Sequence, residues 1–207
     1  MSHAPHCADR DTAFGTLHAM ADPRWRRSAA RVHVAPGAAV LLSDDSPGAD
    51  LAEADGIVAA VFGYPRWNTP GSAALAAQGG HAAAALDAYR RDPDGVLADL
   101  DGHFGLVVLD PARKRALIAT DRAGIYPLFH APAPDGGVIF ATSATAIARH
   151  PAASSAVSPQ AVFDYLFFYR VPAPLSIFEG QRKLLAAQVL RVADGQHRLD
   201  FYWQMPF

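Results

Sequence analysis

A predicted β-hairpin between residues 103 and 120 constrains the fold of this chain more than any other stretch. Two apolar runs rich in β-branched residues, 103–109 and 115–120, are separated by a turn-forming segment that contains Asp110 and Pro111. Both runs are almost wholly apolar, so we expect two strands whose faces are mostly buried. The hairpin is therefore expected in the interior of the fold.

A sharp bend of the chain follows the hairpin. Asp121 and Arg122, an adjacent acid and base, precede Gly124 and Pro127. Glycine permits a positive φ and proline fixes φ near −65°, so the pair predicts a tight reversal with Gly124 at positive φ. A chain bent in this way is expected to re-enter a sheet.

Composition and charge bound the class of protein. The 207 residues are 51% apolar and 18% charged, which is enough for one sizeable core. The formal net charge is only −2, so the protein has no strong electrostatic field of one sign. Neither nucleic acid nor an anionic membrane is therefore an expected partner. No window approaches the roughly 18 apolar residues of a spanning helix, and residues 1–11 do not resemble a signal peptide. A cytoplasmic location is expected, and the single Cys7, which cannot form an internal disulfide, agrees with it.

Further elements follow from periodicity and capping signals. A helix is expected over residues 72–91 with an interruption at Gly79 and Gly80, and another begins at Ser158 with Pro159 at its first position. That second helix carries a wide aromatic stripe over residues 163–169, which needs a partner surface. The other expected elements are strands at 12–17, 31–34, 39–43 and 56–61, a short helix at 144–150, and a closing hairpin of 188–192 with 197–202.

The residues of the hairpin and the bend also carry a family resemblance. The pattern resembles the glutaminase half of asparagine synthetases and consists here of Leu97, Leu100, Gly102, Phe104 and Gly105, then Asp110, then Asp121, Arg122, Gly124, Pro127 and Leu128. Residues 138–143, 165–166 and 171–180 and the pair Tyr202 and Trp203 are similar to later segments of that family. The resemblance implies an α+β fold, a four-layer αββα sandwich of two mostly antiparallel sheets of the N-terminal-nucleophile hydrolase type.

The resemblance also implies a division of the chain. Residues 1–11 are expected to be a mobile tail, and residues 12–192 a domain similar to type 2 glutamine amidotransferases. Residues 193–207 are expected to hold the closing strand and the start of a linker to a synthetase domain. No glycine-rich pyrophosphate loop occurs in the sequence, so the ATP-using synthetase half is absent from this chain.

The nucleophile that the resemblance implies has no clear counterpart. The family uses a cysteine at position two, which becomes N-terminal and takes its own amine as base, whereas this chain has Ser2. If residues 12–17 are the first strand, the nucleophile position falls near Asp11, where there is no free amine. Cys7 would become terminal only after proteolysis. Ser2 and Cys7 are thus low-ranking candidates, and the nearby His3 and His6 with Cys7 lack the rigid frame of a zinc site, so no metal is expected.

The positions that would hold glutamine are altered as well. By the resemblance, Ala39 stands where the family has a carboxylate-binding arginine, and Phe62, Gly63 and Tyr64 stand where it has Asn-Gly-Glu. His81 and Ala83 stand at the positions of an aspartate and a glutamate, of which the aspartate binds the amino group of glutamine. An alanine cannot replace a bidentate guanidinium, and a phenylalanine has no donor for an oxyanion.

Two interpretations of these residues remain open. Phe62, Tyr64 and Trp67 either pack in the core or fill an abandoned glutamine pocket that also contains Ala39, Gly63 and His81. We expect His81 to be a solvent-facing residue at a helix start. Arg31 is a candidate substitute for the missing arginine.

Four altered positions together predict a degenerate glutamine amidotransferase-like domain without glutaminase activity. It is expected to be either part of an asparagine-synthetase-related ATP-dependent ligase or a free-standing remnant. One alternative is an active glutaminase that supplies ammonia through Ser2 or Cys7. Another is a non-catalytic module that docks through residues 163–169 on a separate synthetase subunit, which an exposed apolar patch of several hundred Å² would favour. No cofactor is expected in this chain, because ATP and Mg²⁺ would belong to the synthetase. A homo-oligomer is left open.

Overall fold

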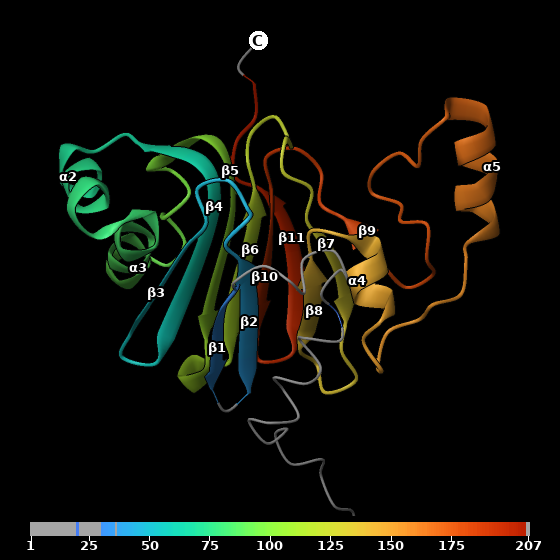
Figure 1. Ribbon diagram of the computed structural model, residues 1–207, viewed down its shortest axis with the longest axis horizontal. Coiled ribbons are helices and arrows are strands. Elements are labelled where there is room, and N and C mark those ends of the chain that lie inside the picture. Colours follow the sequence, from blue (N-terminus) through green and yellow to red (C-terminus); the bar gives the residue numbers. More distant parts are fainter. Residues whose placement is uncertain (1–19, 21–29, 36, 206–207) are drawn as a thin grey trace, which may run out of the picture.

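A six-stranded antiparallel sheet forms the centre of the protein (Figure 1). The computed structural model describes residue 20, residues 30–35 and residues 37–205. The sheet has the order β11-β10-β6-β5-β4-β3. Its strands are β3 (Asp50–Ala54), β4 (Ile57–Trp67), β5 (Leu100–Asp110), β6 (Arg115–Thr120), β10 (Gln188–Ala193) and β11 (Gln196–Phe201). The expected hairpin is β5 and β6, joined by the 3₁₀ turn Pro111–Arg113, and it lies in the middle of the sheet as predicted.

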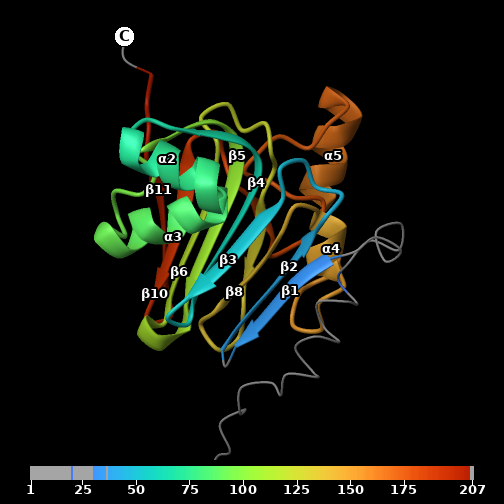
Figure 2. The ribbon, with the colours of Figure 1, turned by 60° about the vertical axis from the view of Figure 1, so that its left-hand side comes forward.

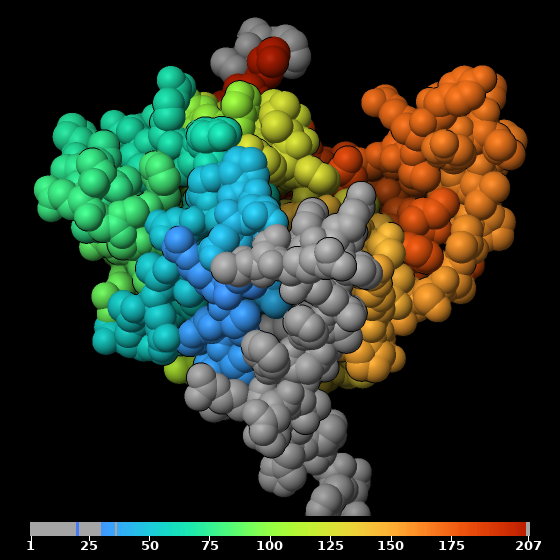
Figure 3. All heavy atoms as spheres, in the orientation of Figure 1, coloured from blue at the N-terminus to red at the C-terminus, as the bar shows by residue number. Residues whose placement is uncertain are grey.

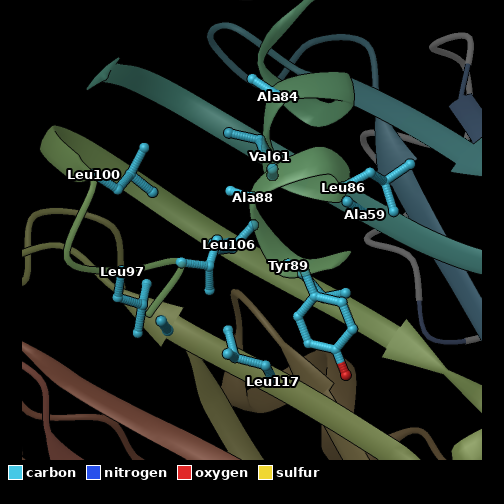
Figure 4. Packing of buried hydrophobic residues seen from close by; sticks show 14 of the residues in the cluster. Ala59, Val61, Ala84, Leu86, Ala88, Tyr89, Leu97, Leu100, Leu106 and Leu117 are labelled. Atoms are coloured by element: carbon cyan, nitrogen blue, oxygen red, sulfur yellow. The ribbon is translucent and has the colours of Figure 1, made fainter. Parts of the chain in front are cut away.

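Two helices cover one face of this sheet. They are α2 (Pro70–Gly79) and α3 (His81–Arg91), divided at Gly80 as the sequence predicts. Small and aliphatic side chains of α3, including Ala84, Leu86 and Ala88, pack against Val61 of β4 and Leu106 of β5 (Figure 4). The alanine-rich sequence of α3 therefore allows the helix to lie close to the sheet.

A second β layer covers the other face, and it consists of two separate sheets. One contains β1 (Ala30–Ala35) and β2 (Ala38–Ser43), and the other has the order β8-β7-β9, with β7 (Phe129–Pro132), β8 (Val138–Ala141) and β9 (Arg182–Lys183). A second core lies between the layers, with Val40 and Leu42 of β2 opposite Val107 and Ile118 of the hairpin.

The short helix α4 (Ala144–Ala148) forms the fourth layer. Its fully buried Ile147 packs with Ala131 of β7 and Ile139 of β8. The chain is therefore an α+β protein with the layer sequence helix, sheet, sheet, helix, which confirms the predicted fold class.

The helix α5 (Pro159–Phe168) stands apart from the four layers. Ser158 caps it by accepting the N–H of Ala161, and Pro159 occupies its first turn, as predicted. Figures 2 and 3 show α5 at the edge of the molecule, in a lobe that projects from the body. Its position leaves one side of the helix open to solvent.

Most expected elements agree with the structure, and the differences have local causes. Strand β4 extends six residues beyond the predicted end at Val61, through Pro65 to Trp67, and pairs with β5 over its whole added length. The strands β3, β7 and β9 were not predicted, because they are short and lack sustained apolar alternation. The expected strand at 12–17 and the expected tail at 1–11 lie outside the described residues. Over the described ranges, no helix has the length and apolar character needed to cross a bilayer.

The loop from β6 to β7 carries the chain from the central sheet to the second β layer. Asp121 is fully buried, and its carboxylate accepts the backbone N–H groups of Ala123 (2.9 Å), Ile125 (3.1 Å) and Tyr126 (3.3 Å). Gly124 has φ 66°, as the sequence predicts. The motif therefore stabilises the bend through backbone hydrogen bonds to one carboxylate.

We expect Gly124→Ala to destabilise the protein by about 1 kcal/mol or more, because an L-residue is strained at this φ. The added Cβ would also lie 3.3 Å from Cα of Ala186. The free energy of unfolding in urea measures the effect. Gly71→Ala in α2, where φ is not positive and nothing lies within 4 Å of the added Cβ, is the matched control and should not be destabilised. Equal stability of the two variants would contradict the strain at Gly124.

We expect Asp121→Asn to destabilise the protein by about 2 kcal/mol, because the amide loses the charge that strengthens three backbone hydrogen bonds and places its own N–H₂ against those donors. Asp87→Asn is the control, since Asp87 is exposed and forms an ion pair with Arg91 one turn away. Denaturant unfolding compares the two variants. A loss at Asp121 no larger than that at Asp87 would be inconsistent with the role assigned to the buried carboxylate.

Candidate functional site

The middle of β4 holds Phe62, Gly63 and Tyr64, the three residues that the resemblance aligns with a glutamine-binding segment. Phe62 is buried in the core between the β layers, and its ring meets that of Tyr126 edge to face at a centroid distance of 5.5 Å. Gly105 on β5 lies opposite Phe62, and a Cβ there would overlap the ring. The absence of a side chain at Gly105 thus provides the space for Phe62, which offers no hydrogen-bond donor at this position.

Gly63 is enclosed by its neighbours. It has φ 96°, and a Cβ would overlap the carbonyl oxygen of His103 and the ring of Tyr126. Its N–H donates to the carbonyl of Pro47 at 2.6 Å, in the turn after β2. Because this backbone N–H already donates to Pro47, it is not free to stabilise an oxyanion on a bound substrate.

Tyr64 does not pack in the core, in contrast to the interpretation that grouped it with Phe62 and Trp67. It is 66% exposed, whereas Phe62 and Trp67 are both buried. Side chains alternate along β4, so Phe62 and Tyr64 point to the same face of the sheet. Tyr64 lies beyond the area that the second β layer covers.

His81 is not a solvent-facing residue, which corrects the expectation from sequence. It begins α3 and is half-buried, and its Nδ1 accepts the indole N–H of Trp67 at 3.2 Å. This hydrogen bond fixes the imidazole tautomer with the proton on Nε2. Trp67 belongs to the core under the helices, so His81 lies on the opposite face of the central sheet from Phe62.

Ala39 lies neither with Phe62 between the β layers nor with His81 under the helices. It alternates along β2 with Val40 and Leu42, which face the core between the β layers, so its own side chain points to the outer face of that hairpin. The side chains of Ala39, Phe62 and His81 therefore do not line one cavity. The candidate substitute Arg31 is held by carboxylates, with ion pairs to Asp44 at 3.2 Å and Asp50 at 3.4 Å.

Charged side chains gather at the exposed edge next to Tyr64. Asp101 lies between Arg66 and Arg122, at 3.2 Å and 3.5 Å. The backbone N–H of Gly102 lowers the pKa of Asp101 most, burial opposes the shift, and the two arginines lower the pKa further. The carboxylate therefore stays ionised and orients two cations at this edge.

Arg122 also links the bend to the C-terminal segment. Its guanidinium lies 5.4 Å from the ring centroid of Trp203, a cation–π contact. The preceding Tyr202 donates its hydroxyl to the carbonyl of Thr120 at 2.9 Å, and burial, followed by the nearby Asp121, raises its pKa. Tyr202 and Trp203 therefore pack against the end of β6 and the bend that follows it.

This edge has no residue suited to nucleophilic attack on an amide. Its described side chains are Tyr64, Arg66, Asp101, His103, Arg122 and Trp203, and none is a serine, threonine or cysteine. Ser2 and Cys7 lie outside the described residues, as do His3 and His6. In the part of the chain that the structure describes, no group of three or more His, Cys, Asp or Glu side chains could hold a metal ion.

Two features of the site were missed from sequence. The contact between Gly63 and Pro47 joins segments that are far apart along the chain, although the dipeptide Pro47-Gly48 does signal a turn. The complementarity of Phe62 and Gly105 depends on strand register, which the hydrophobic pattern alone does not provide for two strands buried on both faces.

Among the solved structures that resemble the chain are two enzymes of low sequence identity. The first, the allosteric regulatory enzyme of purine biosynthesis, has 11% identity and a TM-score of 0.45, and the match covers 74% of this chain and 30% of the other. The second, the glutamine phosphoribosylpyrophosphate amidotransferase from B. subtilis complexed with ADP and GMP, has 12% identity and a TM-score of 0.42, with 77% and 32% covered. The chain spans about a third of the length of each.

No curated protein matches the sequence significantly. A family described as "Glutamine amidotransferase domain" matches residues 80–203, more than half of the chain. The matched range includes α3, the β5–β6 hairpin, the Asp121 bend and the Tyr202–Trp203 pair. This protein therefore belongs to the glutamine amidotransferase domain family.

Proposed function

We propose that this chain is a glutamine amidotransferase domain without glutaminase activity and that it serves as the non-catalytic part of an asparagine-synthetase-related, ATP-dependent ligase. Membership in the amidotransferase family is the starting point. The environment of Phe62 and Gly63 carries the proposal of inactivity. The buried Phe62 ring cannot donate a hydrogen bond, and the Gly63 N–H is bonded to Pro47.

The energetic consequence of these two losses is large. Removal of a single oxyanion donor typically lowers the rate by about 100-fold to 1000-fold. At the position of Phe62 the side chain has no donor, and at Gly63 the backbone donor is occupied by Pro47 at 2.6 Å. Restoring both would require a new side chain at 62 and displacement of the turn that contains Pro47.

The relation to asparagine synthetases rests on the motif around the central hairpin. Gly102, Phe104, Asp121, Arg122, Gly124 and Pro127 follow that pattern, and the Tyr202–Trp203 pair continues it. In this proposal ATP and Mg²⁺ are bound by the synthetase partner, and this chain contributes no cofactor ligand. The acid that such a ligase activates is a property of the partner.

The alternative of an active glutaminase makes a different prediction. An active enzyme would release glutamate and ammonia from glutamine with Ser2 or a processed Cys7 as nucleophile. We expect the purified chain to release no glutamate above the buffer background, measured by an enzyme-coupled glutamate assay. The double variant Ser2→Ala/Cys7→Ala, prepared in parallel, provides the background for contaminating activity. Release by the wild-type chain that either single substitution abolishes would refute the proposal and identify the nucleophile.

The exposed face of α5 favours a second function, docking on the synthetase partner. The helix directs Ala161 and Asp164 inward, and Asp164 is only 8% exposed. Its large hydrophobic side chains face solvent instead, and Leu166 is 72% exposed. The exposed set is Val162, Phe163, Tyr165, Leu166, Phe167, Phe168 and Tyr169. We call this set the α5 face.

The size of the α5 face supports a protein interface. It contains five aromatic rings, each more than half exposed. At about 150–250 Å² per aromatic side chain, the rings alone present on the order of 600 Å² of accessible surface. The largest apolar patch of a typical monomer is about 300–600 Å², so this face fits a surface that a partner covers.

We expect Leu166→Asp to weaken binding of the chain to a purified asparagine-synthetase-type synthetase domain at least tenfold, because a carboxylate at the centre of the α5 face would be buried unpaired. Binding is measured by biolayer interferometry. Tyr64→Asp, at an equally exposed aromatic residue on β4, is the matched control and should bind like the wild type. Equal binding of all three proteins would rule out α5 as the docking face, and a wild-type dimer that Leu166→Asp dissociates would assign the face to self-association.

A further inference from the structure

A cavity of about 460 Å³ lies between the two β layers, at the edge of the central sheet that β11 forms. His130 lines it from β7, His197 from β11, and Ser176, Glu179, Gln181 and Arg182 from the segment that closes it. The volume is in the range of pockets for small metabolites. The cavity is separate from the residues around Phe62 and Gly63.

His130 is the unusual group in this cavity. It is 7% exposed, and neither of its ring nitrogens has a hydrogen-bond partner. Burial, followed by the positive charges of His197 and Arg182, lowers its pKa to about 4, so the ring is neutral at pH 7. A neutral imidazole has one N–H donor and one acceptor. Buried polar atoms are normally paired, so the unpaired ring of His130 is available to a molecule that enters the cavity.

The other polar side chains that line the cavity interior are already engaged. The Ser176 hydroxyl donates to Oε1 of Gln181 at 3.3 Å, and Nε2 of Gln181 donates to the carbonyl of Ser154 at 3.4 Å. Nε2 of His197 is 3.1 Å from the carbonyl of Gly136. Among these groups, His130 is left to bind a molecule from solution together with the charged residues at the mouth.

Arg182 is placed to act with His130. The two residues are direct partners in the register of β7 and β9, and both line the cavity. Side chains of directly opposed residues project from the same face of a sheet, with Cβ atoms about 5 Å apart. No ion pair of the Arg182 guanidinium with another described residue is present within 4.0 Å. The cavity thus combines a free cation with a neutral N–H donor.

This pair selects for a carboxylate. A guanidinium binds the two oxygens of a carboxylate in parallel, and the N–H of a neutral imidazole supplies a further donor. Glu179 also lines the cavity, and its negative charge opposes a dianion such as phosphate more than a singly charged acid. We propose that this cavity is a binding site for the carboxylate group of a small organic acid, held by Arg182 and His130.

The direct test is a titration of the ¹⁵N-labelled chain with sodium acetate at pH 7 and constant ionic strength. We expect saturable shifts of the His130 ring nitrogens and of the backbone N–H groups of Gly180 to Arg182, with a dissociation constant in the millimolar range. Acetamide, which has the same shape and no charge, should bind at least tenfold more weakly. Shifts that do not saturate, or equal binding of acetamide, would overturn the proposal.

A pair of variants locates the site. Arg182→Gln removes the charge of an exposed side chain and should weaken acetate binding at least tenfold while the chain stays folded. Arg198→Gln is the matched control, because Arg198 lies next to His197 on β11, is directed to the opposite face of the strand and pairs with Asp200. It should bind acetate like the wild type. Unchanged binding by Arg182→Gln, or equal losses in both variants, would show that acetate does not bind in this cavity. The result is independent of glutaminase activity, which is measured separately.

Discussion

The fold depends on the hydrogen bonds that converge on Asp121. Its carboxylate holds the N–H groups of the bend, its backbone N–H donates to Phe104 of β5, and its carbonyl accepts from Ala187 just before β10. One residue thereby connects the central hairpin, the crossing to the second β layer and the return of the chain to the sheet edge. Charge-assisted hydrogen bonds in a fully buried position are strong, so this connection tolerates little change.

The neighbouring Arg122 contacts side chains, whereas Asp121 binds backbone groups. Its guanidinium lies 3.5 Å from Asp101 and contacts the ring of Trp203, and both charged side chains are partly buried, so these contacts order the edge of the sheet. An adjacent acid and base in the sequence therefore have separate partners. The acid serves the backbone of the fold, and the base serves the edge where a ligand or partner would approach.

The separation of fold from catalysis follows from the position of these contacts. Asp121 and Gly124 lie on the crossing between the layers, whereas Phe62 and Gly63 lie in the middle of β4. A phenyl ring can occupy the place of a hydrogen-bonding side chain because Gly105 leaves room for it and Tyr126 packs against it. The phenyl ring adds apolar contact to the core and offers no hydrogen-bond donor, so the packing that stabilises the fold does not depend on a donor at this position.

Local chemistry was sufficient to predict the central hairpin, the break between α2 and α3, and the cap of α5, whereas the fold class was predicted from the resemblance of the hairpin and bend motif. It did not predict the partners of His81 or the donor to Pro47, since these contacts depend on which distant segments meet across layers. His130 gave no signal either. No sequence pattern distinguishes a histidine in a short strand. Only the strand register, which places His130 opposite Arg182 in a cavity, singles it out.

The orientation of α5 leaves a large apolar surface exposed to water, although burial of that surface would stabilise the protein. The helix buries Asp164, whose carboxylate accepts from Gln160 at 2.8 Å, and leaves five aromatic rings in water. Burial of apolar surface stabilises a protein by roughly 25 cal/mol per Å², so exposure of these rings forgoes several kcal/mol of hydrophobic stabilisation. The cap at Ser158 and the bridge between Val157 and Phe178 fix the helix in place despite that loss. Local hydrogen bonds thus set the direction of a helix whose hydrophobic face has no counterpart among the described residues.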